Sequence, residues 1–249
     1  MPVSYSRTDR GRRRTKNQDY VFAVSGQVGI FPNLYIVADG MGGHEAGEFA
    51  SQYTVERLVK EAMTDTGREP RDLIDHGLRL ANAELRELAA ARHLLLGMGT
   101  TAVAATISEE GELLVGSVGD SRLYILRREG LEQITHDHSM VQEMVDAGTI
   151  GREEARTHPE RNVITRAVGA EDRLLVDFYT AQLKRGDIVL LCTDGLTTML
   201  RDEEIEEVIR SCSDLELAAD SLIREANENG GKDNISLILV DPWTEVAND

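Results

Sequence analysis

Residues 34–44 place the tightest constraint on the fold of this chain. An apolar run, residues 34–38, passes directly into Asp39 and then into three glycines within four positions. Tyrosine, isoleucine and valine favour a short buried strand, which the glycines end abruptly. Because an unpaired buried carboxylate is costly in free energy, Asp39 needs either a cation or the backbone N–H groups of a turn. Capping of a helix that begins near Gly47 is the simpler alternative.

Size and charge exclude several classes of protein. The chain has 249 residues, enough for one large or two small domains with a real core. It carries 44 acidic and 27 basic residues, a formal net charge of −17. Nucleic acids and anionic membranes bind basic surfaces, so broad electrostatic binding to either is not expected.

Cysteine usage and hydropathy indicate the compartment. Cys192 lies in an apolar run and Cys212 in a predicted helix, without the paired spacing of a disulfide framework or a zinc site. No apolar stretch reaches the ~18 residues of a membrane-spanning helix, and residues 1–4 lack the apolar core of a signal peptide. We therefore expect a soluble cytoplasmic protein with no membrane segment.

Hydrophobic periodicity predicts a mixed architecture. Apolar residues at helical spacing indicate amphipathic helices over residues 47–63, 72–91, 202–211 and 215–229. Short β-rich segments between turn residues predict strands at 20–24, 34–38, 100–107, 113–118, 123–126, 174–181, 187–192 and 235–240. Hairpin-type strands flanked by helix pairs favour two antiparallel sheets packed together with helices outside, as one domain.

Two segments depart from this pattern. Residues 139–168 lack clear strands and carry short predicted helices at 139–147 and 151–157, so we interpret them as a lid or flap. Residues 4–19 are polar, and five cations fall within seven positions: Arg10, Arg12, Arg13, Arg14 and Lys16. This segment is either a solvated basic arm or a source of one arginine for an anion site, because a guanidinium fork suits phosphate oxygens.

Four aspartates share one sequence context. Each touches a glycine or a glycine-rich turn at a strand end: Asp39, Asp120, Asp194 and Asp233. Carboxylates with backbone carbonyls and water are the ligands of Mg²⁺ and Mn²⁺, and four clustered carboxylates would not all ionise without cations. Two ions about 3.5–4 Å apart would generate a hydroxide and clamp a transferring phosphoryl group, which Arg14 or a neighbour would hold. Four unrelated turn aspartates are the alternative.

Six motifs occur in order along nearly the whole chain, from about residue 4 to 240. They are Thr8-Asp9-Arg10-Gly11 with Arg14-x-x-Asn17-Gln18-Asp19, Asp39-Gly40-Met41-Gly42-Gly43-His44, Gly99-Thr100-Thr101, Gly119-Asp120-Ser121-Arg122, Thr193-Asp194-Gly195 and Asp233-Asn234. The ordered set resembles the metal-dependent protein phosphatases of type 2C, the PPM family, and its bacterial branch most. Each motif is weak alone, and the set is highly specific.

The resemblance implies both a fold and an activity. The fold would be a four-layer α-β-β-α sandwich of α+β class, one catalytic domain over residues 1–249 with the flap at 139–168. The activity would be hydrolysis of phosphoserine and phosphothreonine in proteins, by direct attack of a metal-bridging hydroxide, opposing bacterial Ser/Thr kinases. A monomer that binds phosphorylated proteins and no nucleic acid is expected.

The same resemblance implies roles for the site residues. Asp39 would bridge two Mn²⁺ or Mg²⁺ ions, with the Gly40 carbonyl on one ion and Asp194 and Asp233 on the other. Asp120, together with Asp194, resembles the ligands of a third, weaker ion.

Three further positions complete the site implied by the resemblance. Arg14 matches the phosphate-binding arginine. Asp19 would support the metals through bound water, and Asn234 is a candidate for the outer shell.

One position departs from the animal members of the family. They carry a histidine directly after Asp-Gly that is regarded as the general acid, and Met41 stands there in this chain. His44, three residues on, either protonates the leaving oxygen or has a structural or outer-shell role. His136 and His138, near the flap, are interpreted as structural.

Two other functions compete with phosphoprotein hydrolysis. A module that binds phosphoproteins without turnover would have lost a metal aspartate, and none is lost here. A hydrolase of small phosphoesters is poorly distinguished, because the motifs read phosphate and little else of a substrate. A cysteine-based phosphatase is not expected, since Cys192 lacks a phosphate-cradling loop and reads as core.

Overall fold

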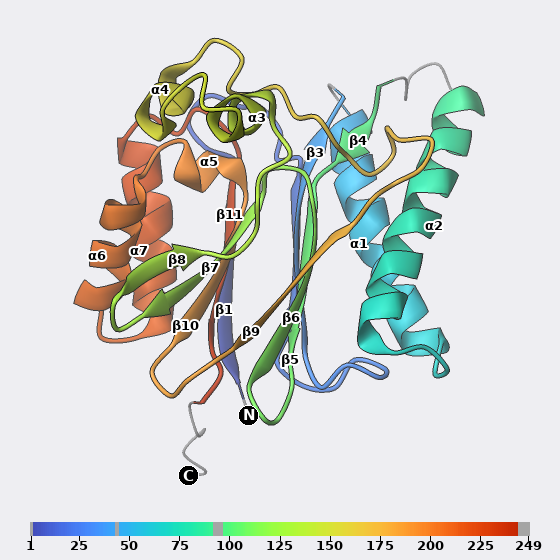
Figure 1. Cartoon of the computed structure of the whole chain (residues 1–249), viewed down its shortest axis with the longest axis horizontal. Helices are drawn as coiled ribbons and strands as arrows, with labels where there is room; N and C mark the ends of the chain where they lie inside the picture. The colour runs from blue at the N-terminus through green and yellow to red at the C-terminus, as the bar shows by residue number, and fades with distance from the viewer. Residues whose placement is uncertain (1, 43–44, 92–96, 244–249) are drawn as a thin grey trace.

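The chain forms two antiparallel β-sheets packed face to face, with helices on both outer faces (Figure 1). The computed structural model describes residues 2–42, 45–91 and 97–243. One sheet has the order β1 (Val3–Asp9), β11 (Ile235–Asp241), β10 (Ile188–Cys192), β7 (Arg122–Arg127) and β8 (Gly130–Gln133). The other has the order β2 (Asp19–Val24), β3 (Leu34–Met41), β5 (Ala102–Ile107), β6 (Glu112–Val118) and β9 (Asp177–Gln182), and β4 (Gly99–Thr100) pairs with β3.

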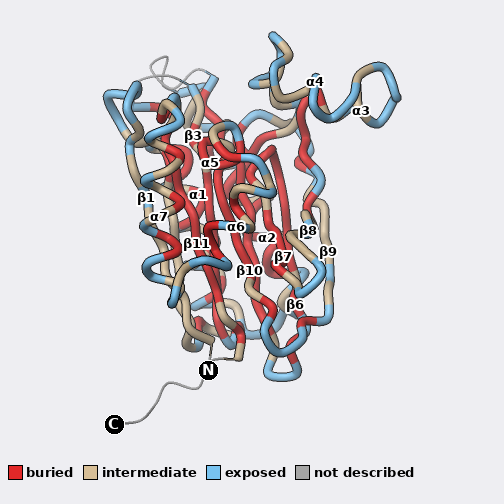
Figure 2. Tube along the Cα trace, turned by 90° about the vertical axis from the view of Figure 1, so that its left-hand side faces the viewer, coloured by how far each residue is buried: buried red, intermediate tan, exposed pale blue. Residues whose placement is uncertain are grey.

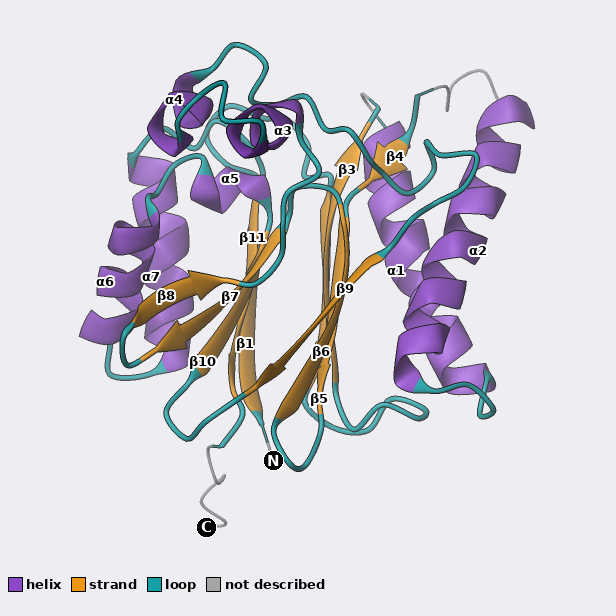
Figure 3. Ribbon diagram, in the orientation of Figure 1, coloured by secondary structure: helices purple, strands orange, loops and turns teal. Residues whose placement is uncertain are grey.

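Helices cover each sheet on its outer side. The β3 sheet carries α1 (Ala46–Thr64) and α2 (Pro70–Ala91), and the β10 sheet carries α5 (Asp194–Thr197), α6 (Asp202–Ser211) and α7 (Leu215–Glu228). Two short helices, α3 (Met140–Asp146) and α4 (Arg152–Thr157), lie beyond the strand ends, at the top of the view in Figure 3. None of the helices in the described ranges is long and apolar enough to span a bilayer.

The alternation of side chains along β3 explains the layers. Tyr35 and Val37 point into the core between the sheets, where they join residues of the facing sheet such as Leu191 and Ile238. Ile36 points the other way, into the core beneath α1 and α2. Side chains buried on both faces make the central strands the most buried part of the chain (Figure 2).

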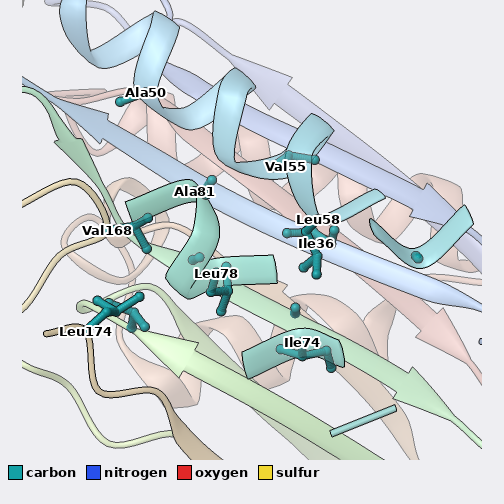
Figure 4. Packing of buried hydrophobic residues seen from close by; sticks show 14 of the residues in the cluster. Ile36, Ala50, Val55, Leu58, Ile74, Leu78, Ala81, Val168 and Leu174 are labelled. Carbon is teal, nitrogen blue, oxygen red and sulfur yellow. The ribbon is translucent and has the colours of Figure 1, made fainter. Parts of the chain in front are cut away.

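The helix-facing core uses the predicted apolar stripes. Leu58 of α1 and both Ile74 and Leu78 of α2 are fully buried and gather over Ile36 (Figure 4). Fully burying one such side chain stabilises a fold by about 1.5–3 kcal/mol. The stripes therefore fix the helices on the sheet, as expected.

Some predicted element boundaries were wrong. Residues 3–9 are not part of a solvated arm but form β1, an edge strand that pairs along its whole length with β11. Its small polar residues and partial exposure on both sides hid the strand signal. The short elements β8 and α5 were missed, and β9 begins at Asp177 rather than at residue 174.

Candidate active site

Asp19 and Asp39 lie opposite each other where two strands meet. The β2–β3 register pairs them directly, because β2 begins and β3 ends at the same edge. Thr193 donates its hydroxyl hydrogen bond to Asp19 Oδ2 over 2.9 Å. The other oxygen, Asp19 Oδ1, is buried and has no hydrogen-bond partner. A buried oxygen without a partner is costly, so this carboxylate favours an added positive charge or donor.

The main chain of Asp39 is held by two threonines. Its N–H donates to Thr101 Oγ1 at 2.9 Å, and its carbonyl accepts from Thr101 N at 2.9 Å and from Thr100 Oγ1 at 2.8 Å. Thr101 Oγ1 also lies 2.7 Å from Ser121 Oγ. These bonds hold the main chain that carries the half-buried carboxylate and tie β3 to the turn that carries Asp120.

Gly40 is required by a close backbone approach. A Cβ at this position would lie 2.0 Å from the carbonyl oxygen of Gly47, at the start of α1. The Gly40 N–H donates to the Gln18 carbonyl at 3.1 Å. Gly40 therefore lets β3, α1 and the entry to β2 meet. The proposed role of the Gly40 carbonyl as a ligand stays a prediction.

Asp194 and Asp233 come from the facing sheet. Asp194 follows β10 and begins α5, and its Oδ1 is buried without a hydrogen-bond partner. Asp233 stands just before β11; its Oδ1 accepts from the N–H of Asn234 at 2.8 Å. Arg14 Nη2 donates to Asp233 Oδ2 at 2.6 Å. Arg14 thus lies at the rim of the carboxylates with its guanidinium half-exposed.

Asp120 occupies the turn between β6 and β7 and is buried. Gly119 before it has φ +99°, and a Cβ there would lie 2.5 Å from Thr101 Cγ2. The Gly119 N–H donates to His138 Nδ1 at 2.9 Å, and the Gly119 carbonyl accepts from the His138 N–H at 2.9 Å. The turn is therefore fixed against the residue that precedes the flap.

Burial, and after it mutual repulsion, raises the pKa of the carboxylates. Loss of solvent, with repulsion from Asp194 and Asp233, raises the pKa of Asp19 to about 7. Loss of solvent and then the charge of Asp233 raise the pKa of Asp194 to about 6. The pKa values of Asp39 and Asp120 lie well above their ordinary range, first through burial and then through neighbouring aspartates. The cluster as a whole therefore favours compensation by cations.

The donor atoms fit hard divalent ions. All are oxygens, and two of them, Asp19 Oδ1 and Asp194 Oδ1, are buried without partners. Within the described ranges, no group of three or more His, Cys, Asp or Glu side chains converges to hold an ion by itself. Mg²⁺ and Mn²⁺ sites ordinarily complete their shell with carbonyls and water, so a few carboxylates spread over two sheets suit such ions.

The side chain of Asn234 makes hydrogen bonds that could not be predicted from the sequence. Its side chain is buried, and Nδ2 donates to the carbonyls of Arg10 at 2.9 Å and Lys16 at 2.8 Å. Its Oδ1 accepts from the N–H of Gln18 at 2.9 Å. Asn234 therefore clamps the basic segment beside Asp233, and an outer-shell role toward metals stays a prediction.

The structure bears differently on the three histidines singled out in the sequence. His44 lies outside the described residues. His138 is buried between Gly119 and Asp177, whose Oδ2 lies 3.1 Å from Nε2, which supports a structural role. His136 Nε2 lies 2.9 Å from Asp146 Oδ2 on α3.

The predicted flap is closed on itself at its start and anchored near the carboxylates at its end. At its start, Ser139 forms an isolated β-bridge with Ile164, within the flap itself. At its end, Val168 exchanges two backbone hydrogen bonds of 2.9 Å with Thr100, the neighbour of the Asp39 carbonyl. The sequence motifs contain Thr100, Thr101 and Thr193, but their role was not predicted. The signal that could have revealed it is a hydroxyl-bearing residue next to, or packed against, a proposed metal ligand.

Comparison with known proteins identifies the family to which this chain belongs. The sequence profile described as protein phosphatase 2C matches residues 8–235. The chain belongs to the protein phosphatase 2C family. The resemblance inferred from the six ordered motifs is thereby confirmed. A chain of this family is a hydrolase, a PP2C-type phosphatase.

Relatives of this family align along nearly the whole chain. The serine/threonine phosphatase stp of Listeria innocua is 40% identical over 245 residues, which cover 94% of each chain. The S. agalactiae serine/threonine phosphatase structure is 35% identical with TM-score 0.90, and covers 98% of this chain and 100% of that one. The PstP catalytic domain, solved with 2 manganese ions, is 35% identical with TM-score 0.82 over 96% of this chain and 97% of its own. The α+β sandwich of two antiparallel sheets is therefore confirmed as the family fold.

Proposed function

We propose that this chain is a metal-dependent phosphatase that hydrolyses phosphoserine and phosphothreonine in proteins. The observation that carries the proposal is the carboxylate cluster between the sheets, with two buried oxygens lacking partners and Arg14 at its rim. The names of the relatives, serine/threonine phosphatases of 35–40% identity, support the same substrate class.

The proposed metal set is the one that the resemblance to the family implies. Asp39, the Gly40 carbonyl, Asp194 and Asp233 would hold two Mn²⁺ or Mg²⁺ ions, with Asp19 acting through water. Asp120 and Asp194 would share a third, weaker ion. Such ions lower the pKa of a bound water and neutralise charge on a phosphoryl group.

The remaining steps fall to side chains of this protein. Arg14 uses one nitrogen on Asp233, which leaves donors of its guanidinium for phosphate oxygens. Thr101 and Thr193 hold Asp39 and Asp19 in place during turnover. His44 is proposed either as the acid for the leaving oxygen or as an outer-shell residue.

The wider setting is also part of the proposal. The whole chain, residues 1–249, would act as one catalytic domain and as a monomer, reversing the work of a Ser/Thr kinase. A cytoplasmic location agrees with two cysteines that are both free thiols in the described chain. Nucleic acid is not proposed as a partner, given the net charge of −17.

One assay separates this function from its competitors. The Mn²⁺-loaded protein is offered a phosphothreonine peptide, a phosphotyrosine peptide and an aryl phosphate, and phosphate release is measured. We expect kcat/KM to be higher for the phosphothreonine peptide than for the phosphotyrosine peptide. Turnover of the aryl phosphate with no turnover of either peptide would instead indicate a small-molecule phosphoesterase. Stoichiometric peptide binding without release of phosphate would indicate a binding module.

A further inference from the structure

Residues 10–16, here called the basic arm, are a local reversal of charge on an acidic protein. Five exposed cations lie in this arm: Arg10, Arg12, Arg13, Arg14 and Lys16. The whole chain has a net charge of −17. Within the described ranges, Arg14 pairs with Asp233 and Lys16 with Glu45 at 3.3 Å, whereas the other three arginines have no carboxylate partner. The arm therefore presents three uncompensated guanidinium groups to solvent.

The arm is fixed rather than a loose tail. The N–H groups of Arg12 and Arg13 both donate to the Gly231 carbonyl, at 2.8 and 3.1 Å. Gly11 has φ +76°, and a Cβ there would lie 2.0 Å from the Asp233 carbonyl oxygen. With the Asn234 clamp on the carbonyls of Arg10 and Lys16, these contacts hold the arm on the turn that carries a proposed metal ligand. The main chain of the arm thus has a defined position before any partner binds.

The arm contains Arg14, beside which the phosphate would lie. Arg14 contacts Asp233 at 2.6 Å, and its charge also acts on Asp39 and Asp194. Arg13 and Arg12 are the two residues that directly precede Arg14 in the chain. An extended peptide advances about 3.3 Å per residue. Side chains one to four residues from a phosphorylated residue bound at Arg14 would therefore pass over the arginines beside it.

We propose that the basic arm makes this phosphatase select phosphorylated residues flanked by acidic side chains, through Arg10, Arg12 and Arg13. This proposal rests on the function proposed above. An acidic enzyme otherwise repels an acidic segment, and a cationic strip beside the site reverses that repulsion where the substrate must dock. The same acidic background disfavours anionic membranes and nucleic acids, which need a broad basic face.

The test compares three phosphothreonine peptides with the Mn²⁺-loaded full-length chain. They share one core and carry acidic, neutral or basic residues at the flanking positions, and kcat/KM is measured for each. We expect the acidic peptide to exceed the basic one by roughly fivefold or more at low salt, since two or three weak exposed pairs act together. In ~1 M salt, where the Debye length is about 3 Å, the ratio should fall toward one.

Reversal of the charge provides the sharper variant. In Arg12→Glu/Arg13→Glu the ratio should invert, so that the basic peptide becomes the better substrate. The matched control, Arg128→Glu/Lys184→Glu, makes the same change of charge in exposed turns after β7 and β9, away from α5 and the site (Figure 1). It should keep the wild-type ratio. Because the readout is a ratio between peptides, a general loss of activity or folded protein cancels.

Each other outcome has a defined meaning. A wild-type ratio near one would overturn the arm proposal while leaving the phosphatase function standing. A ratio that Arg12→Glu/Arg13→Glu leaves unchanged would do the same. Arm-dependent sedimentation with phosphatidylserine vesicles, with an unchanged peptide ratio, would assign the arm to membranes and overturn the proposal. Failure to hydrolyse any of the phosphopeptides would overturn both proposals.

Discussion

At the scale of single residues, the site consists of charges that oppose one another. Asp19 and Asp39 face each other across two strands, and Asp194 and Asp233 approach from the other sheet. Thr193 donates to the Asp19 carboxylate and Thr101 holds the main chain of Asp39, and neither threonine supplies a charge that would neutralise a carboxylate. Arg14 is the one cation in the described chain that pairs with Asp233. This arrangement makes substitutions of individual residues informative.

Arg14→Ala should weaken phosphate binding and spare the metals. The change removes a charge-assisted donor with a net value of about 1.5–3 kcal/mol, so inhibition by free phosphate should weaken roughly ten- to hundredfold. Mn²⁺ affinity, measured by calorimetry, should not decrease, since Asp233 loses only a competing partner. Arg128→Ala is the control. An unaltered inhibition constant for phosphate in Arg14→Ala would move the role to another residue of the basic arm.

Asp120→Ala distinguishes a ligand from a turn residue. If Asp120 shares a third ion with Asp194, the variant keeps the two tighter sites but loses turnover by more than about tenfold. Calorimetric Mn²⁺ titration and peptide hydrolysis at saturating Mn²⁺ on the same sample measure both. Asp146→Ala, at an exposed aspartate of α3, should retain turnover. Retained activity with a lowered Tm in Asp120→Ala would show that this residue stabilises the turn and is not a metal ligand.

At the scale of elements, the sequence predicted what periodicity controls and missed what pairing controls. The helix α2 was expected at 72–91 and spans Pro70–Ala91, because its apolar stripe repeats regularly. The edge strand β1 was missed because neither of its faces is fully buried. The aspartates were found because a strand running into Asp-Gly is a local signal. The Asn234 clamp was not, since its partners Arg10 and Lys16 lie more than 200 residues away in sequence.

Gly40→Ala tests how closely β3 and α1 must approach. The added methyl would meet the Gly47 carbonyl oxygen at 2.0 Å, so the two elements must separate. Overpacking of this kind costs about 1–3 kcal/mol, and Tm should fall by several degrees. Gly26→Ala is the matched control, because no atom lies within 4 Å of its added Cβ. Equal melting temperatures for the two variants would contradict the predicted contact.

At the scale of the whole molecule, the sandwich brings together two acidic edges that the isolated sheets would keep apart. The core between the sheets, with Tyr35, Val37, Leu191 and Ile238 among its members, holds the edges in register. Folding therefore concentrates negative charge in a protein that is already at −17. The stability of the metal-free protein should record this cost.

We predict that the metal-free protein is more stable at pH 5 than at pH 8. Folding raises the pKa values of the aspartates above the ordinary value of about 3.9. The protonated aspartates therefore contribute stability to the folded state at low pH. It is lost as pH rises through the folded values, about 7 for Asp19 and about 6 for Asp194. His138, whose pKa burial lowers, acts in the opposite direction but is one group against four.

Calorimetric Tm values at the two pH values, with and without Mn²⁺, check this prediction. Mn²⁺ at pH 8 should remove most of the deficit, because it supplies the missing positive charge. Asp39→Asn should narrow the difference between the metal-free Tm values. A Tm for metal-free wild type that is higher at pH 8 would mean that folding does not raise the pKa values of these carboxylates.

The most direct test of the central claim is phosphothreonine-peptide hydrolysis as a function of Mn²⁺ added to metal-stripped protein. The claim is that the carboxylates between the two sheets work by holding divalent cations. We predict no turnover in excess chelator, full recovery on addition of Mn²⁺ or Mg²⁺, and loss of that recovery by orders of magnitude in Asp39→Ala or Asp233→Ala while the fold is kept. Full turnover in chelator after verified metal removal, or wild-type turnover in either variant, would contradict the account.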